Sequence, residues 1–323
     1  MSSGERGLAG TARSHVEAAT YPVELQDKVD EYLDGLRFAA EPGTARLEEA
    51  MRYSLLAGGK RIRPVLALAT AEALGRPVEE VLPLAAAIEM IHTYSLIHDD
   101  LPAMDDDELR RGKPTCHVAF GEDVAILAGD GLFAEALRLA LAEQPGEPAN
   151  VLAAIREVVT AAGTSGMVGG QFLDVAGEES LAATHTETDP RAGGAREPTI
   201  SLRHLHELKT GALIAASVGS VLALEGLDGP PTMPFRRFAA ELGVVFQIVD
   251  DILDVTGDEA ELGKPRGSDE RHGKATYVSV FGLDRARELA KESHAAARAA
   301  LAEADGATGR LGQIADYILT RTT

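Results

Sequence analysis

Residues 82–108, LPLAAAIEMIHTYSLIHDDLPAMDDDE, decide the fold of this chain. Residues 82–98 carry apolar side chains on nearly all sides of a helix, so we expect this helix to be buried at the centre of the protein. Acidic residues follow at once, and they occupy six of the ten positions 99–108. Carboxylates this close together repel one another unless water or a cation separates them. The sequence therefore predicts a central apolar helix that ends in a charged site.

Helical patterns continue on both sides of this central helix, whereas alternating strand patterns are nearly absent. We expect further helices at 65–74, 123–143, 151–162, 200–211, 235–255 and 284–303, with a buried helix at 211–224. No internal repeat or long linker divides the chain, which predicts an all-α protein with a single domain over residues 1–323. Residues 1–20 are expected to fray, and the Gly-, Glu- and Thr-rich segment 176–199 to form a surface loop.

Composition narrows the classes of function. The formal charge is 31 − 51 = −20, which argues against a nucleic-acid partner and against binding to an anionic membrane surface. The single cysteine, Cys116, excludes an intrachain disulfide and favours a cytoplasmic protein. The N-terminus lacks the apolar core of a signal peptide, and 211–224 is short for a membrane span, so we expect no integral membrane segment.

A second acidic cluster lies in FQIVDDILD, residues 246–254. Asp250 and Asp254 are one helical turn apart on the same face, and Gln247 lies one turn earlier. A lone acidic run such as 99–108 is compatible with a solvated turn, but two such clusters are better explained as walls that face each other across a cavity. Mg²⁺ suits this arrangement because it prefers oxygen ligands and keeps positions for substrate phosphates.

The first cluster needs a break in its helix to form such a wall. Six residues separate Asp99 from Asp105 and rotate the helix by about 240°, which points the two side chains apart. Pro102 removes a backbone donor, so we expect the LPAM segment to unwind. Either Asp105 or Asp106 then returns to the metal side, and spacing does not distinguish them.

Several basic residues could bind the phosphate groups of a substrate. The stretch GGKRIRP, residues 58–64, places three cations in four positions beside two glycines. Such a run is often only solvated surface, but Arg is favoured for bidentate phosphate contacts and Lys as a point charge. Further candidates adjoin a glycine or an acidic cluster: Arg110, Arg111, Lys209, Lys264 and Lys274. Neither a P-loop nor a dinucleotide-binding fingerprint is present, which argues against an ordinary nucleotide site.

These blocks resemble the trans-isoprenyl diphosphate synthase (polyprenyl synthetase) family, and most closely its short-chain bacterial farnesyl diphosphate members. The similarity covers residues 47–318. It includes GGKRIRP, IHTYSLIHDDLPAMDDDELRRGKPTCH, MVGGQFLD, HELKTGAL, FQIVDDILD, LGKPRGSDERHGKATYVSVFG and ADYILTR. The resemblance implies an isoprenoid synthase-type bundle of about a dozen helices around a deep cavity, usually a homodimer. The long segment 176–199 departs from the compact family pattern and touches none of these motifs.

The resemblance also implies a reaction. Three Mg²⁺ ions hold the diphosphate of an allylic substrate (dimethylallyl or geranyl diphosphate) and help it leave; the allylic cation is then attacked by isopentenyl diphosphate, and a proton is lost. Metal ions neutralise charge on the leaving group, and apolar walls exclude water. No protein nucleophile is required, in agreement with the absence of an evident nucleophile–base pair in the sequence.

Residue roles follow block by block from the same resemblance. The metal ligands would be Asp99, Asp100, Asp105, Asp106, Asp250 and Asp254, with Asp251 and Lys209 also in the catalytic set. Isopentenyl diphosphate would be held by Lys60, Arg63, His92 and Arg111. The allylic diphosphate would be held by Arg110, Lys209, Thr210, Gln247, Lys264 and Lys274. Gln171 and Asp174 would line the cavity. Without its block, His92 would be interpreted as an ordinary core histidine.

Product length is expected to depend on the residues just before Asp99. Tyr94 lies about 7.5 Å below Asp99 along the helix, where its ring, beside Ser95, would obstruct a long prenyl tail. A packed core aromatic is the alternative interpretation of Tyr94. We expect a C15 product, farnesyl diphosphate, with a C20 geranylgeranyl product as the nearest alternative. A terpene cyclase is disfavoured by the DDILD second motif, and a non-catalytic partner subunit by two complete acidic motifs.

Overall fold

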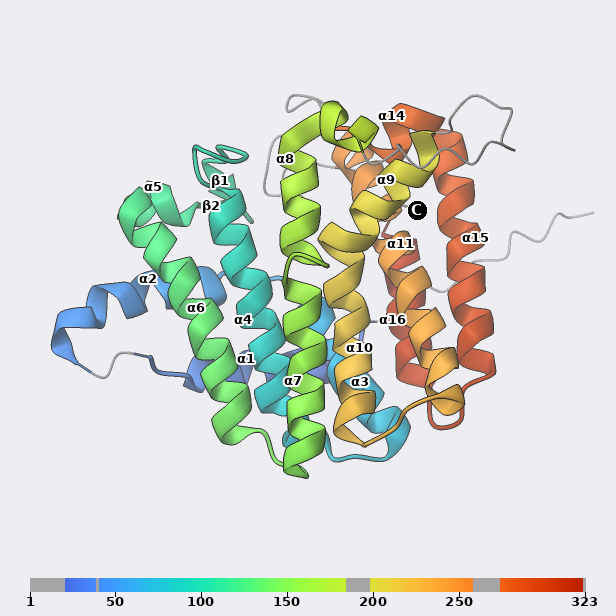
Figure 1. The fold of residues 1–323 in the computed structure, drawn as a ribbon, viewed down its shortest axis with the longest axis horizontal. Helices are drawn as coiled ribbons and strands as arrows, with labels where there is room; N and C mark the ends of the chain where they lie inside the picture. Colours follow the sequence, from blue (N-terminus) through green and yellow to red (C-terminus); the bar gives the residue numbers. More distant parts are fainter. Residues whose placement is uncertain (1–20, 39–40, 184–197, 258–273, 322–323) are drawn as a thin grey trace, which may run out of the picture.

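The computed structural model describes residues 21–38, 41–183, 198–257 and 274–321. Helices make up nearly all of its regular structure (Figure 1), which confirms the all-α prediction. The exception is a small antiparallel hairpin of β1 (Leu109–Arg110) and β2 (Lys113–Pro114). The N-terminal residues 1–20 expected to fray, and Lys264, lie outside the described residues.

The first half of the chain forms α1 (Val23–Gly35), α2 (Ala45–Leu55), α3 (Ile62–Leu74), α4 (Leu82–Asp99), α5 (Cys116–Phe120), α6 (Glu122–Glu143) and α7 (Pro148–Ala162). The second half forms α8 (Met167–Ala183), α9 (Pro198–His206), a π-helical segment η3 (Glu207–Gly211), α10 (Ala212–Leu224), α11 (Met233–Thr256), α14 (Tyr277–Phe281), α15 (Leu283–Ala302) and α16 (Gly309–Thr320). Short 3₁₀ turns are η1 (Pro42–Thr44), η2 (Val78–Val81) and η4 (Pro230–Thr232).

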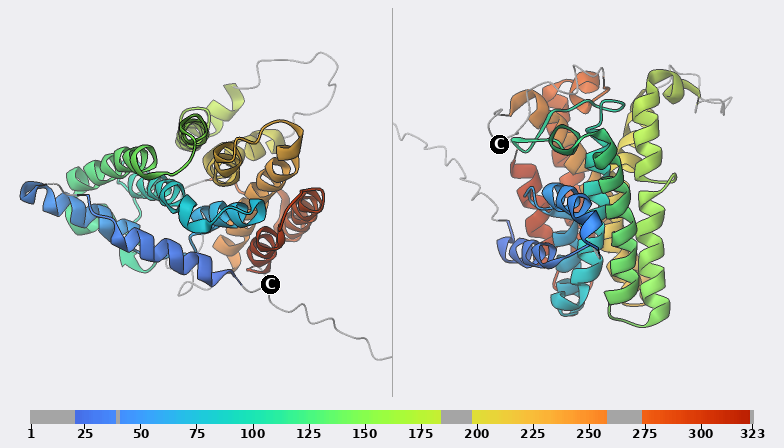
Figure 2. Two further views of the ribbon diagram at one scale, coloured as in Figure 1. Left: turned by 90° about the horizontal axis from the view of Figure 1, so that it is seen from below. Right: turned by 90° about the vertical axis from the view of Figure 1, so that its left-hand side faces the viewer.

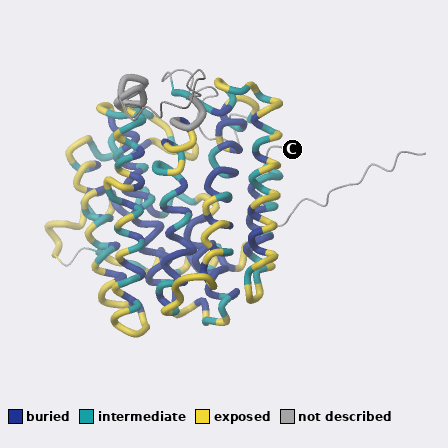
Figure 3. Tube along the Cα trace, turned by 45° about the vertical axis from the view of Figure 1, so that its right-hand side comes forward, coloured by how far each residue is buried: buried dark blue, intermediate teal, exposed yellow. Residues whose placement is uncertain are grey.

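Helix α4 lies at the centre of this arrangement (Figure 2). It packs against α1, α2, α3, α6 and α10, and nearly all of its side chains are buried. This follows from its sequence, because a helix that is apolar on all sides is stable only when neighbours cover every face. One continuous hydrophobic core extends from α1 to α16, with buried residues in the interior and exposed ones along the outer faces (Figure 3).

The helices expected from hydrophobic periodicity are present, with boundaries that differ by a few residues. The largest difference lies at 200–211, where the structure has two conformations: α9 ends at His206, and η3 continues as a π-helix to Gly211. The helices α1, α2 and α16 were not among those expected from the pattern. Two of them have narrow buried faces: α1 buries Leu25, Val29 and Leu33, and α2 buries Ala50, Met51 and Leu55.

The predicted surface loop 176–199 is wrong at both of its ends. Helix α8 continues through Ala183, and α9 begins at Pro198. Residues 176–183, AGEESLAA, contain mainly Ala, Glu and Leu, which are favourable in a helix, and this outweighs the low apolar content on which the loop prediction was based. Residues 184–197 lie outside the described part of the chain.

Three helical stretches of the described chain are long and apolar enough, by length and composition alone, to cross a membrane: Val78–Asp99, Pro148–Val175 and Leu202–Leu224. Within the protein, 72%, 39% and 61% of their respective apolar windows are buried. Packing against other helices therefore accounts for most of the apolar content of the first and third stretches. The second leaves apolar side chains exposed on α7 and α8, including Leu152, Phe172 and Val175.

Candidate active site

The end of α4 unwinds as the sequence predicts. The helix stops at Asp99, and the following turn folds back so that the backbone N–H of Asp105 donates to the carbonyl of Asp99 at 2.9 Å. Asp106 takes a left-handed conformation with φ of +52°, and its N–H donates to the carbonyl of Leu101. This turn brings Asp105 next to Asp99, which spacing alone did not decide.

Two lysines connect the carboxylates at this point. Lys209 of η3 lies 2.6 Å from Asp174 of α8 and 3.9 Å from Asp99. The Nζ of Lys274 lies 2.8 Å from Asp105 and 3.5 Å from Asp174. Asp174 thus lies between the two lysines, and the four elements that carry these residues converge on one charged cluster.

Burial and charge act in opposite directions within this cluster. Burial raises the pKa of Asp99; Lys209 and Lys274 oppose that rise, whereas the carboxylate of Asp105 adds to it. Burial alone would also raise the pKa of Asp174, but the two lysines lower it. Asp99 is therefore a carboxylate whose charge is only partly compensated by the protein. A further cation or a cation-bound ligand would be attracted to it.

Glycines allow the backbones around Lys209 to approach closely. A Cβ added at Gly170 of α8 would lie 2.2 Å from the backbone nitrogen of Lys209. A Cβ at Gly243 of α11 would lie 2.9 Å from the Cα of Gly211. Larger residues would separate α8 and α11 from η3. The glycines thus place Gln171 and Asp174, one turn apart on α8, beside Lys209, and Gln171 donates a side-chain hydrogen bond to Asp99.

The second acidic motif on α11 divides into exposed and buried carboxylates. Asp250 is exposed, whereas Asp251 and Asp254 are buried. Asp251 accepts hydrogen bonds from the Gln247 amide and from the backbone N–H of Tyr277, each at 2.7 Å, and so fixes the start of α14. Its position is therefore set by the fold. Gln247 also accepts from the Thr210 hydroxyl at 2.9 Å, which connects α11 to η3.

The segment 274–277 brings the two acidic motifs to the same end of the bundle. Its first residue, Lys274, contacts Asp105, and its last, Tyr277, donates to Asp251. Three residues span at most about 11 Å, so the two motifs lie on either side of this short segment. Figure 1 shows α14 at the same end of the molecule as the hairpin that follows α4.

The donor set of these motifs fits a magnesium ion that is shared with a phosphate ligand. Asp99, Asp105 and Asp250 offer carboxylate oxygens, the ligand type that Mg²⁺ prefers. Across the described residues, no three His, Cys, Asp or Glu side chains converge into a closed cage. Mg²⁺ usually takes one or two carboxylates and completes its shell with water and substrate phosphate, so an open arrangement of this kind is suitable.

A second cluster, of opposite charge, surrounds Arg63 at the start of α3. Arg63 is only 8% exposed, and its Nε has no hydrogen-bond partner within the described residues. Burial, with a contribution from Arg111, lowers its pKa to about 10. Burial and the same arginines hold the pKa of His92 well below its usual range. These groups form a desolvated cationic site that an anion would stabilise.

Arg111 and Lys60 flank this cationic site. The Arg111 guanidinium donates to the carbonyl of Gly58 and covers Gly59, where a Cβ would lie 2.5 Å from its Cζ. The Nζ of Lys60 lies 5.5 Å from the centre of the Tyr317 ring on α16, within the range of a cation–π contact. The structure thus brings together three of the four residues expected at one diphosphate, Arg63, His92 and Arg111, and places Lys60 in the loop that Arg111 covers.

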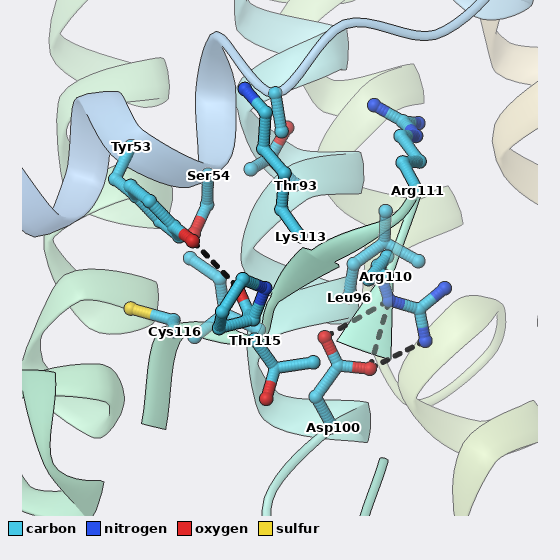
Figure 4. A pocket seen from close by; sticks show the side chains of 13 residues that line it. Tyr53, Ser54, Thr93, Leu96, Asp100, Arg110, Arg111, Lys113, Thr115 and Cys116 are labelled. Atoms are coloured by element: carbon cyan, nitrogen blue, oxygen red, sulfur yellow. Dashed lines mark hydrogen bonds and ion pairs between the residues drawn. The ribbon is translucent and has the colours of Figure 1, made fainter. Parts of the chain in front are cut away.

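Asp100 and Arg110 form a separate ion pair (Figure 4). The Arg110 Nε lies 2.8 and 2.9 Å from the two carboxylate oxygens of Asp100, and its Nη2 lies 2.5 Å from one of them. They border a cavity of about 30 Å³ between α2, α4 and the hairpin, which has room for little more than a water molecule. In this structure each therefore satisfies the other's charge.

Tyr94 and Ser95 lie on the buried part of α4 below Asp99. The Tyr94 ring packs edge-to-face against Phe133 of α6, with centroids 5.2 Å apart, and against His98 at 5.7 Å. The Ser95 hydroxyl donates to the carbonyl of His92. Both interpretations of Tyr94, a packed aromatic and a cavity floor, are compatible with this contact.

Sequence reasoning missed two groups that the structure places at the site. Arg61 was counted only as a third positive charge, yet it forms a buried ion pair with Glu89. His206 lies on α9 one turn before Lys209 and stacks on Tyr277 with ring centroids 5.5 Å apart. Neither ring nitrogen of His206 finds a hydrogen-bond partner among the described residues. No sequence pattern distinguishes either residue from a solvated one, because their partners are distant in the chain.

Comparison with known proteins decides the family. A sequence model of the polyprenyl synthetase family matches residues 44–315. The chain belongs to the polyprenyl synthetase family. Its relatives include the farnesyl diphosphate synthase of Geobacillus stearothermophilus, 45% identical over 86% of this chain and 90% of that protein. They also include the large subunit 1 of the chloroplastic heterodimeric geranylgeranyl pyrophosphate synthase of Arabidopsis thaliana, 41% identical over 98% and 83%.

A solved structure gives the same result for the polyprenyl synthetase fold. The geranyltransferase from Helicobacter pylori, complexed with magnesium and isoprenyl diphosphate, superposes with a TM-score of 0.77 at 31% identity and covers 93% of this chain and 95% of its own. The predicted fold and family are confirmed, and the chain is a prenyltransferase of the trans-prenyl diphosphate synthase type. Both farnesyl and geranylgeranyl synthases are among its relatives, so similarity does not select the product.

His206 should make the stability of this polyprenyl synthetase depend on pH. Burial lowers its pKa from 6.5 to about 4, so the unfolded chain takes up the proton first as the pH falls. The contribution is complete above pH 6.5 and is lost towards pH 4. Between pH 7.5 and 5 it amounts to about 2 kcal/mol. In urea unfolding, His206→Phe should lose that much less stability than the wild type over this interval.

The exposed neighbour His204 provides the matched control. His204→Phe should retain the pH dependence of the wild type, since it leaves His206 and its buried surroundings unchanged. Equal pH dependence of the His206→Phe variant and the wild type would contradict the assignment.

Proposed function

We propose that this prenyltransferase condenses isopentenyl diphosphate with dimethylallyl and geranyl diphosphates, in the presence of Mg²⁺, to give farnesyl diphosphate. One observation carries the proposal: two oppositely charged clusters lie at the ends of buried helices and meet at α11, where the Arg63 guanidinium lies 5.8 Å from the centre of the Phe246 ring and Asp250 acts electrostatically on Arg63. The carboxylates around Asp99 suit a metal-bound diphosphate, and the buried cations around Arg63 suit a second, metal-free diphosphate. An enzyme that condenses two prenyl diphosphates needs a binding site for each diphosphate.

In this proposal the acidic cluster binds the allylic diphosphate. Asp99, Asp105 and Asp250 would hold Mg²⁺, which would supply Lewis-acid chemistry by neutralising charge on the leaving diphosphate. Lys209 and Lys274 exchange part of their contact with Asp174 and Asp105 for phosphate oxygens. Thr210 and Gln247, already hydrogen-bonded to each other, line the same side, and Lys264 is proposed for the same substrate.

The remaining acidic residues act less directly in this scheme. Asp100 keeps Arg110 in place through their ion pair. Asp251 fixes Gln247 and the start of α14. Asp106 and Asp254 stay candidates for the metal, with Asp106 in the turn beside Asp105 and Asp254 one helical turn after Asp250. Gln171 and Asp174 orient the Lys209 ammonium and the Asp99 carboxylate.

The cationic cluster binds isopentenyl diphosphate in the proposal. Arg63 and Arg111 offer guanidinium groups for bidentate contacts, and Lys60 adds a point charge. His92 stays neutral at physiological pH, because its pKa is lowered by burial and by the arginines, so it serves as a hydrogen-bonding group. The apolar faces of α4 exclude water from the allylic cation, which water would convert to an alcohol.

Two observations favour farnesyl diphosphate as the product. One is the position of Tyr94, and the other is the 45% identity to the farnesyl diphosphate synthase from Geobacillus stearothermophilus. Tyr94 is held against Phe133, so its ring has little freedom to move out of the path of a growing tail. Geranylgeranyl diphosphate is the second candidate, because relatives at 41% identity carry that name.

We also propose a cytoplasmic homodimer. The outer faces of α6 and α8 expose large apolar side chains, among them Leu127, Leu141 and Phe172, the last 66% exposed. Large exposed apolar side chains are unfavourable in water unless a partner covers them. Light scattering on the purified chain should give twice the mass of 34.0 kDa. A monomer at micromolar concentration would contradict the dimer and leave the proposed activity unaffected.

Turnover is the direct test of the proposed function. Purified enzyme with Mg²⁺, dimethylallyl diphosphate and isopentenyl diphosphate should form mainly C15 diphosphate, identified by mass spectrometry after phosphatase treatment. Chelation with EDTA should abolish turnover, and added Mg²⁺ should restore it. A predominantly C20 product would overturn the farnesyl assignment. Activity that appears only with a second protein would support the role of a heteromer subunit instead.

Truncation of Tyr94 should lengthen the product. Tyr94→Ala removes the ring that limits the tail, so products of C20 and longer should appear in the same assay. Thr93→Ala is the matched control, because Thr93 is also buried on α4 but lines the small cavity beside Asp100. An unchanged product profile in the Tyr94 variant would show that Tyr94 is only a packed aromatic.

A further inference from the structure

We infer that Arg61 and Glu89 form a buried positioning pair for the isopentenyl diphosphate subsite, in which Arg61 holds the loop 58–61 and does not itself bind phosphate. The inference rests on the proposed function and assigns a role to a cation that the motif GGKRIRP would otherwise present as a third phosphate ligand. The neighbouring cations therefore have different roles: the protein neutralises Arg61, whereas Lys60 and Arg63 bind the substrate.

Each of the three guanidinium nitrogens of Arg61 donates a hydrogen bond to a partner inside the protein. Its Nε donates to Asp30 of α1, its Nη1 to Glu89 of α4, and its Nη2 to the carbonyl of Leu55 at the end of α2, each at 2.8 Å. Arg61 is 3% exposed and Glu89 is 2% exposed. A single guanidinium thus joins three helices at the point where the loop enters α3.

The loop has a conformation that needs such an anchor. Arg61 has a φ of +52°, in the left-handed region, which a residue with a Cβ adopts only when its surroundings fix it. Gly58 and Gly59 before it also have positive φ. On the other side, the Arg111 guanidinium donates to the carbonyl of Gly58. The loop is therefore held from the core by Arg61 and from the site by Arg111.

Glu89 is the counter-charge of the cationic cluster as well as the partner of Arg61. Burial lowers the pKa of Arg63 and of Arg111, and Glu89 opposes the change in both. Burial alone would lower the pKa of Arg61, but Glu89 and Asp30 together raise it. The protein thus satisfies Arg61 internally, whereas Arg63 retains a buried Nε without a partner in the described chain. A diphosphate would therefore bind to Lys60 and Arg63, on either side of Arg61 in the motif.

A double-mutant cycle tests the pair. Arg61→Gln and Glu89→Gln should each raise the KM for isopentenyl diphosphate about tenfold, with the KM for geranyl diphosphate and kcat at saturation within about twofold. The double variant should be no worse than the more affected single variant, because either change alone already breaks the pair. Arg61→Lys, which keeps a charge for Glu89 and loses the three-way fork, should give an intermediate KM.

Direct binding makes the test independent of turnover. Calorimetric titration of inorganic pyrophosphate into the same variants, without allylic substrate, should show the same order of affinity. An inactive wild-type enzyme would count against the proposed function alone, since this titration still reports on the loop. Asp30→Asn removes the half-exposed partner of Arg61 and should give a smaller loss of pyrophosphate affinity. This variant tests the inference if the Arg61 and Glu89 variants do not fold.

Two results would overturn the inference. If Arg61 is itself a phosphate ligand, Glu89→Gln frees its guanidinium, so the KM for isopentenyl diphosphate falls and the two single effects add. If the pair is only structural, both KM values, kcat and the melting temperature change together. Arg76→Gln, which breaks a less buried arginine–glutamate pair with Glu225 at 2.5 Å at the far end of α3, is the control and should leave both KM values unchanged.

Discussion

Like-charge repulsion at the end of α4 is the constraint on which the rest of this structure depends. A helix buried on every face delivers Asp99 into the interior, and the turn after it returns Asp105 to the same place. Carboxylates in such a position destabilise the fold unless cations accompany them. Lys209 and Lys274 fulfil this requirement through Asp174, and their positions in turn require η3, the glycine at 170 and the start of α14.

A second cluster with the opposite charge balances the first across the site. Arg63 and Arg111 are desolvated and only partly compensated by Glu89, which makes them suitable for an anion. The net charge of −20 conceals this, because it sums over a surface that is mostly acidic. A bound diphosphate interacts with the charges close to it. At this site the buried cations and any bound metal determine the sign of the electrostatic potential.

Much of the fold was predictable from the sequence because burial imposes a helical period on apolar residues. The central helix at 82–98 and its acidic end were located within a residue, and the unwinding after Asp99 followed from Pro102. The helices α1 and α2 were missed because their buried faces are narrow, with three buried residues each. The loop expected at 176–199 failed because composition was given more weight than the helix propensity of residues 176–183.

For the site, the sequence by itself determined which residue types are present and in which blocks, and these sufficed for the family. Tertiary structure alone decided which charges satisfy each other. Within GGKRIRP, Arg61 forms ion pairs with Glu89 and Asp30, whereas the Nε of Arg63 has no hydrogen-bond partner within the described residues. In DDILD, Asp251 is committed to Tyr277, whereas Asp250 is exposed. Neighbours in the chain are chemically alike, and only packing, which brings distant partners within about 3 Å, makes them different.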